Sequence, residues 1–193
     1  MLVLGIDPGL SRCGYGVLET AGAARAGGSG GAEAVAAGVL RTSPDVATPQ
    51  RLATLQHEIA ALVDEFSPAA VAVERVFFSA NVRTAIGVAM AAGLALAAGA
   101  AAGAEVAEYT PNQVKIAVAG WGAAPKDQVQ RMVQTLLGLP DVLKPADAAD
   151  AAAVALCHIA HCGLLRAAAA GTTAGATGGA GSAPRAAAAA VSP

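Results

Sequence analysis

The chain has few aromatic residues, 3% of its 193 residues, although 55% of the residues are hydrophobic. Much of that apolar content is alanine, so the interior is expected to consist of closely packed layers of small side chains. A chain of this length can bury a sizeable core in one compact domain. The composition therefore favours a single globular domain.

Cysteine is also scarce, and the three cysteines exclude two common roles. Cys13, Cys157 and Cys162 are odd in number and show no Cys-x-x-Cys or Cys/His ligand spacing. This pattern fits reduced thiols in a reducing compartment and argues against a disulfide framework or a zinc site. The histidines, to which we assign no catalytic role, are His57, His158 and His161.

No segment has the features expected of a membrane span or an export signal. The longest apolar stretch, Val88 to Ala102, is rich in alanine, interrupted by Gly93 and Gly99, and shorter than a bilayer requires. The N-terminus enters an apolar strand without a basic region and a hydrophobic signal segment. We therefore expect a cytoplasmic protein with a helix buried between protein surfaces.

The charge balance, −2 with a pI near 5.9, argues at first against a nucleic-acid partner, because phosphates need a positive surface. Basic residues nevertheless gather in the middle of the chain: Arg75, Arg83, Lys115, Lys126 and Arg131. They could form a basic rim around an acidic centre, or they could be ordinary solvated charges.

The order of apolar and turn-forming segments predicts an α/β domain. Leu52, Leu55, Ile59 and Leu62 recur at helical spacing after Thr48-Pro49, an N-cap signature that Thr110-Pro111 repeats. The predicted strands are 2–7, 14–19, 34–41, 69–74 and 105–109, and the predicted helices are 48–66, 80–102, a short one after 111, 125–137 and 146–166. We assign 1–166 to one domain and expect 167–193, which is of low complexity, to be disordered.

Four carboxylates are the candidate catalytic residues. Asp7 and Glu74 each end an apolar strand, and Asp147 and Asp150 lie three residues apart on one face of a predicted helix. A carboxylate at the tip of a buried strand is poorly solvated and is tolerated mainly when a cation neutralises it. Together the four acids predict a metal-dependent nuclease, in which hard oxygen ligands hold divalent cations that activate water.

Each acid also has a structural alternative. Asp7 could form a turn before Pro8, and Glu74 could pair with a nearby arginine. The two later acids could stabilise the N-terminus of their helix. The joint occurrence of all four favours the metal site.

The arrangement resembles the RuvC family of bacterial Holliday junction resolvases over about residues 1 to 165. The similar motifs are Gly5-Ile6-Asp7-Pro8-Gly9-Leu10-Ser11-Arg12-Cys13-Gly14-Tyr15-Gly16, Val73-Glu74-Arg75-Val76-Phe77, Pro111-Asn112-Gln113-Val114-Lys115, Lys126-Asp127-Gln128-Val129-Gln130 and Asp147-Ala148-Ala149-Asp150-Ala151. The resemblance implies a ribonuclease H-like fold, with a five-stranded mixed sheet whose first three strands are antiparallel and whose faces carry helices. It also implies a homodimeric, Mg²⁺-dependent endodeoxyribonuclease that nicks a four-way DNA junction symmetrically.

The resemblance further implies roles for individual residues. The four acids would be the catalytic ligands of two Mg²⁺ ions, for which Mn²⁺ should substitute. Phe77 would be a wedge between bases, and Lys115 and Lys126 would contact DNA. A junction-binding and branch-migration motor complex of the RuvA and RuvB type would be the partner. From the residues alone, we expect Phe78 in the core and further DNA contacts from Arg75 and Arg83 of the basic rim.

Three rival functions are compatible with parts of the pattern. Another ribonuclease H-like nuclease could act on RNA, and an actin-like or sugar-kinase ATPase shares the first hairpin. The ATPases need two lobes, for which 193 residues leave no room. A non-catalytic junction-binding protein would be expected to lack at least one of the four carboxylates.

Overall fold

The structure is a computed structural model that describes residues 1–20, 31–76 and 82–175. Residues Met1–His161 form one compact unit, to which the description below refers. Its elements are β1 (Leu2–Asp7), β2 (Arg12–Thr20), β3 (Ala32–Arg41), α1 (Thr48–Phe66), β4 (Ala70–Glu74), α2 (Val82–Ala101), β5 (Glu105–Tyr109), α3 (Pro111–Ala119), α4 (Lys126–Leu136) and the first part of α5 (Ala146–Gly175).

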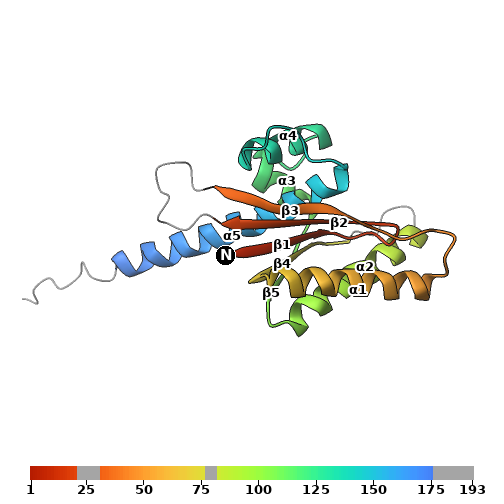
Figure 1. The fold of residues 1–193 in the computed structure, drawn as a ribbon. Helices are drawn as coiled ribbons and strands as arrows, with labels where there is room; N and C mark the ends of the chain where they lie inside the picture. Colours follow the sequence, from red (N-terminus) through yellow and green to blue (C-terminus); the bar gives the residue numbers. More distant parts are fainter. Residues whose placement is uncertain (21–30, 77–81, 176–193) are drawn as a thin grey trace, which may run out of the picture. The chain divides into compact units, whose positions relative to one another are not determined.

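One five-stranded sheet organises the unit, with strand order β3-β2-β1-β4-β5 (Figure 1). The first three strands pair antiparallel, whereas β4 runs parallel to both β1 and β5. Helix α2 is the crossover between the parallel strands β4 and β5, and the chain between β1 and β4 passes through β2, β3 and α1. The predicted mixed sheet with three antiparallel strands is confirmed.

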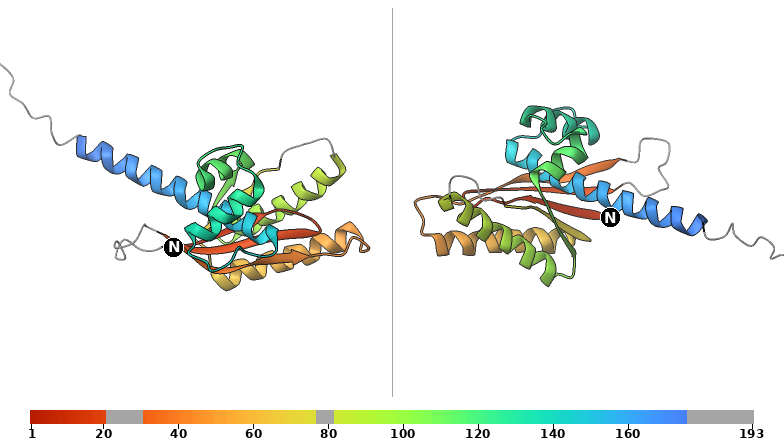
Figure 2. Two further views of the ribbon diagram at one scale, coloured as in Figure 1. Left: turned by 90° about the horizontal axis from the view of Figure 1, so that it is seen from above. Right: turned by 180° about the vertical axis from the view of Figure 1, so that it is seen from behind.

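The two faces of the sheet carry different helices. Because side chains alternate along a strand, Leu4 and Ile6 of β1 pack toward α1 and α2, whereas Val3 faces the cluster built with α3, α4 and α5. On β4, Val71 and Val73 belong to the first cluster. The right-hand view of Figure 2 shows the same separation, with α1 and α2 together on one side of the sheet.

Glycines in the first two strands let α5 lie directly on the sheet. Gly5 and Gly16 are cross-strand partners. A Cβ atom on Gly5 would stand 2.2 Å from the carbonyl oxygen of Ala151, and one on Gly16 would stand 2.9 Å from the Cα of Ala152. Real side chains cannot occupy such space. These glycines therefore decide how close α5 comes to β1.

The observed helix ends differ from the predicted ones in two places. The N-cap of α1 is Ala47, without a side-chain cap bond, so Thr48 is the first helical residue rather than the cap. The prediction at Thr110 is confirmed, since its hydroxyl accepts from the amide of Gln113 in a reciprocal capping box. Helix α5 continues to Gly175, nine residues beyond its predicted end, through an alanine-rich segment with high helix propensity. The domain boundary at 166 stays a prediction.

Helix α2 is slightly shorter than predicted, but its continuous apolar window is longer than the expected stretch from Val88 to Ala102. Its window Thr84–Ala101 is long and hydrophobic enough to cross a membrane by length and composition, with 28% of the window buried. Length alone therefore does not exclude a span, contrary to the expectation from the sequence. One face of α2 nevertheless packs into the core of the unit through Ala91, Ala92 and Ala95.

Candidate active site

The parallel pairing of β1 and β4 brings the first two acids together. Ile6 is in register with Val73, so Asp7 and Glu74 follow at the same edge of the sheet. Asp7 continues the face that carries Val3 and Gly5, and Glu74 continues that of Ala70 and Ala72. Both carboxylates therefore point to the side of the sheet that α5 covers.

Helix α5 supplies the third acid, Asp150. It immediately precedes Ala151, whose carbonyl oxygen lies against Gly5, and its side chain lines a cavity of about 270 Å³. The residues that line the cavity are Asp7, Glu74, Pro111, Val114, Lys115, Lys126, Val129, Asp150 and Ala153. Three of the four predicted acids thus meet at one cavity, together with two of the predicted basic residues.

The electrostatics of this cavity are those of a cation site. Burial, and then the charges of Glu74 and Asp150, raise the pKa of Asp7 to about 8. Burial also raises the pKa of Glu74 above its ordinary value. Like charges held in a partly desolvated space oppose ionisation. A bound cation would remove this opposition, so the cavity favours a positive ion.

Lys126 partly neutralises the acids. Its Nζ lies 2.5 Å from Oδ2 of Asp150, and the pKa of Lys126 is raised mainly by that hydrogen bond. The side chain is 63% exposed, so it could turn from the carboxylate to a phosphate at little cost. Lys115 also lines the cavity, and its charge acts on Glu74.

The fourth acid, Asp147, lies outside the lining of the cavity. Nε of Arg12 donates to its Oδ2 at 3.0 Å, and Nη2 of the same guanidinium donates to the same oxygen. The hydrogen bond from Arg12 lowers the pKa of Asp147. Arg12 belongs to the motif around Asp7, and no feature of the sequence pairs it with Asp147, 135 residues away.

Two other predicted basic residues, Arg75 and Arg131, do not line the cavity. Arg75 follows Glu74 directly but extends toward Glu108, with 3.9 Å between Nη2 and Oε2. Arg83 lies on α2, but its side chain is outside the described part of the chain, as is the whole of Phe77. Arg131 pairs with Asp127 at 2.5 Å.

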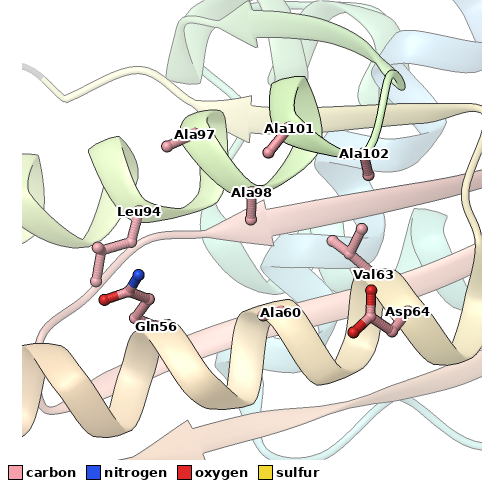
Figure 3. Close-up of a pocket in the computed structure, with 9 residues that line it drawn as sticks. All are labelled: Gln56, Ala60, Val63, Asp64, Leu94, Ala97, Ala98, Ala101 and Ala102. Carbon is pink, nitrogen blue, oxygen red and sulfur yellow. The ribbon is translucent and has the colours of Figure 1, made fainter.

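A second cavity, of about 410 Å³, lies between α1 and α2 (Figure 3). Alanines dominate its lining, with Leu94 and Val63, and its polar side chains are Gln56 and Asp64. One carboxylate among alanines offers no set of ligands or nucleophiles. The larger cavity is therefore not the candidate active site.

The acidic cavity has a donor set that suits a hard divalent cation. Asp7, Glu74 and Asp150 supply carboxylate oxygens, which Mg²⁺ and Mn²⁺ prefer. No thiol or imidazole lines this cavity. The buried thiols Cys13 and Cys157, whose pKa values burial raises to about 12, are held elsewhere in the core.

Comparison with known proteins identifies the family. The family described as crossover junction endodeoxyribonuclease RuvC matches residues 3–158. The crossover junction endodeoxyribonuclease RuvC of Leifsonia xyli is 50% identical over 169 residues, which cover 88% of this chain and 78% of that protein. The chain belongs to the RuvC family. The nuclease class predicted from the four acids is therefore confirmed.

Solved RuvC structures support the same assignment and the ribonuclease H-like fold. RuvC of Thermus thermophilus matches with a TM-score of 0.77 at 37% identity, covering 85% of this chain and 96% of that one. The T. thermophilus RuvC in complex with a Holliday junction substrate matches with a TM-score of 0.75 at 35% identity over the same shares. The acidic cavity thus lies in a RuvC fold.

Proposed function

We propose that this RuvC-family protein resolves four-way DNA junctions by paired, symmetric nicks during homologous recombination and DNA repair in the cytoplasm. Each nick would leave 5′-phosphate and 3′-hydroxyl ends. The observation that carries the proposal is the acidic cavity, in which three carboxylates from three different elements face two lysines. Such a cavity suits a divalent cation and the phosphate that it binds.

Within this cavity, Asp7, Glu74 and Asp150 would hold Mg²⁺, and Asp147 would join them on leaving Arg12. The cation supplies charge stabilisation and a water of lowered pKa. Two ions per site is the number that four acids would support. Lys115 and Lys126 would hold the scissile phosphate, because both already border the acids.

Phosphate contacts farther from the cavity would come from Arg75 and Arg83, and Phe77 would enter the opened bases. Arg75 supports this role because it is exposed and only distantly paired with Glu108. A motor complex of the RuvA and RuvB type would deliver the junction, as the family resemblance implies.

Symmetric incision needs two copies of the site, and the exposed face of α2 fits a second copy. Ile86, Met90, Gly93 and Ala97 are exposed and recur at steps of three and four residues, which places them on one stripe. The opposite face of the helix is buried on the sheet. Large apolar stripes on a soluble protein mark interfaces, and small residues let two helices approach closely. We assign this stripe to a homodimer.

A cleavage assay tests the proposed function. A mobile four-way junction, a linear DNA duplex of the same sequence and an RNA duplex are incubated with the protein and Mg²⁺. Paired nicks at symmetric positions of the junction, without comparable cleavage of the two duplexes, are expected. Preferred cleavage of the RNA would favour the rival nuclease, and tight junction binding without cleavage would favour the non-catalytic one.

The same cleavage assay, repeated with other divalent cations, tests the metal requirement. Mn²⁺ should support cleavage because it accepts the same oxygen ligands as Mg²⁺ in a similar geometry. Ca²⁺ is larger and less exacting in geometry, so it should support junction binding with little turnover. Rapid cleavage with Ca²⁺ would contradict the proposed ligand set.

The dimer is tested by a charge on the exposed stripe of α2. Met90→Arg should shift the sedimentation of the protein toward a monomer and replace paired nicks by single ones. Bulk at Ala92 is unsuitable for this test, because Ala92 is 5% exposed and a large side chain there would disrupt the core. Thr54→Arg on the exposed face of α1 is the matched control. A wild-type monomer at micromolar concentration would reject the dimer.

A further inference from the structure

Trp121 is the one tryptophan of the chain, and the fold leaves it 49% exposed. Among the described residues it is the only exposed aromatic side chain, since Tyr109 is buried and Tyr15 and Phe66 are partly buried. Burial of a tryptophan is strongly favourable in a chain with so few aromatic residues. Its position in solvent therefore needs a reason.

The backbone on both sides of Trp121 is held in place. Gly120 adopts φ +82° and caps α3 through its amide, which donates to the carbonyl of Ile116. On the other side, Gly122 lies against the side chain of Asn112 at the start of α3, where a Cβ would stand 1.6 Å from its Oδ1. The amide of Ala124, a buried residue, donates to the carbonyl of Trp121 at 3.3 Å. The indole is thus presented by a preorganised connection, which lowers the entropy lost on binding.

This connection joins the two helices that border the acidic cavity. Lys115 of α3 and Lys126 of α4 both line the cavity, and Trp121 is five residues before Lys126. Five residues of extended chain span at most about 18 Å. Successive phosphates of one DNA strand are about 3.4 Å apart along the helix axis. Trp121 can therefore reach nucleotides within roughly five steps of a phosphate held at Lys126.

We propose that Trp121 stacks on a base that is exposed where the DNA helix is interrupted, near the strand to be cut. The proposal rests on the proposed function, because it takes junction DNA as the ligand. Base faces inside a continuous duplex are covered by their neighbours, whereas bases at a strand exchange point can offer a face to an indole. Trp121 would thus help the protein to distinguish a junction from linear DNA.

The tryptophan is also the reporter for the test. An Asp7→Asn protein, which should bind without cutting, is titrated with an unlabelled four-way junction while the fluorescence of Trp121 is recorded. Anisotropy of a dye-labelled junction gives the affinity independently. Strong quenching with the junction and little with a linear duplex of the same sequence are expected.

Substitution of Trp121 separates stacking from electrostatic attraction. Trp121→Ala should weaken junction binding by about 5- to 150-fold, the equivalent of roughly 1–3 kcal/mol per stacked base. Trp121→Phe should retain most of the affinity, and neither variant should change the salt dependence, which reports phosphate contacts. Leu136→Ala, which removes another exposed apolar side chain at the far end of α4, is the control and should bind as the parent does. Melting temperatures check that each variant folds.

Three results would overturn the inference. Normal anisotropy binding with neither quenching nor an effect of Trp121→Ala would leave the proposed function standing and remove Trp121 from it. If the fluorescence of Trp121 is quenched as the protein concentration rises, and not as DNA is added, the indole belongs to a contact between protein copies. Failure of the parent to bind the junction by either signal would reject the proposed function together with this inference.

Discussion

The two cavities lie on opposite faces of one sheet and differ in what their linings can do. The cavity between α1 and α2 is larger, about 410 Å³ against 270 Å³, but alanines dominate its lining. The smaller one contains Asp7, Glu74, Asp150 and two lysines. In the smaller cavity, burial and like charge oppose the ionisation of Asp7 and Glu74.

The volume of a cavity therefore does not identify the active site of this protein. A void between alanine-rich helices arises where small side chains fail to fill space, and its cost is a modest loss of packing. Buried carboxylates cost far more, and a fold retains them where a ligand neutralises them. Changes on the two faces should therefore have very different consequences.

Removal of one negative charge from the acidic cavity should have the largest effect. Asp7→Asn keeps the size of the side chain but loses a ligand charge, so the rate of junction cleavage should fall by several orders of magnitude. Because repulsion from Glu74 and Asp150 also disappears, the metal-free variant should melt no lower than the wild type. Single-turnover cleavage and thermal unfolding measure the two effects. Nicking at near the wild-type rate would remove Asp7 from the metal site.

The contact between α5 and the sheet should be the next most sensitive feature. Gly5→Ala would place a methyl group against the carbonyl oxygen of Ala151, so the helix that carries Asp150 must move. We expect destabilisation at or above the upper end of the roughly 1–3 kcal/mol usual for overpacking. Gly163→Ala, in open space on the same helix, is the matched control and should stabilise slightly. Denaturant unfolding compares the two, and equal stability would show that α5 does not depend on Gly5.

The same substitution on the two faces sharpens the comparison directly. Ala153 is buried but, unlike Ala92, borders the acidic cavity, so Ala153→Leu directs three extra carbons into that space, where they should exclude the phosphate and slow cleavage at least about tenfold. Ala60→Leu puts the same carbons into the apolar cavity and should leave the rate within about twofold. Cleavage by folded, dimeric protein is the measurement. Equal losses would mean that the apolar cavity also takes part in the reaction.

The acidic cavity should also make stability depend on pH. The folded pKa of Asp7, about 8, is raised above its ordinary value of 3.8. The contribution of this group is therefore fully present below pH 3.8 and is lost as the pH rises toward 8, because the unfolded chain ionises more easily. In EDTA, Asp7→Asn should be less sensitive to pH between 4 and 8 than the wild type. Identical melting curves for both proteins over this range would contradict the burial of the charge.

A buried polar pair beyond the cavity should show the smallest effect. The hydroxyl of Tyr109 lies 3.0 Å from Nδ1 of His158, whose pKa burial lowers. This pair is polar but neutral and borders neither cavity. Tyr109→Phe should cost about 0.5–1.5 kcal/mol of stability and leave cleavage unchanged. A slower reaction in the folded variant would extend the active site to this pair.

Part of the site could be predicted because its signals are local. Asp7 and Glu74 each end a short apolar run, and parallel pairing then had to bring them to one edge of the sheet. The i, i+3 spacing of Asp147 and Asp150 likewise placed both on one helical face. The motifs around these acids identified the RuvC family, which the comparisons confirm. The mixed sheet and its three antiparallel strands followed from the same resemblance, whereas the strand order comes from the structure.

Other features depend on contacts between distant segments, and no local pattern determines them. Arg12 forms a hydrogen bond with Asp147, 135 residues away in the sequence. Asp147 therefore does not join the three acids that line the cavity. Within the apolar helix α2, likewise, only packing shows that Ala92 lies in the core while Met90 is exposed.

The residues that are able to hold a cation can be identified from the sequence alone, because charge and side-chain chemistry are properties of each residue. Which of these residues meet depends on tertiary packing, because it requires α5 to approach the backbone of β1 closely. Gly5 and Gly16 permit that approach because they have no side-chain atoms. The need for glycine at these two positions is visible only in the packing of α5 against the sheet.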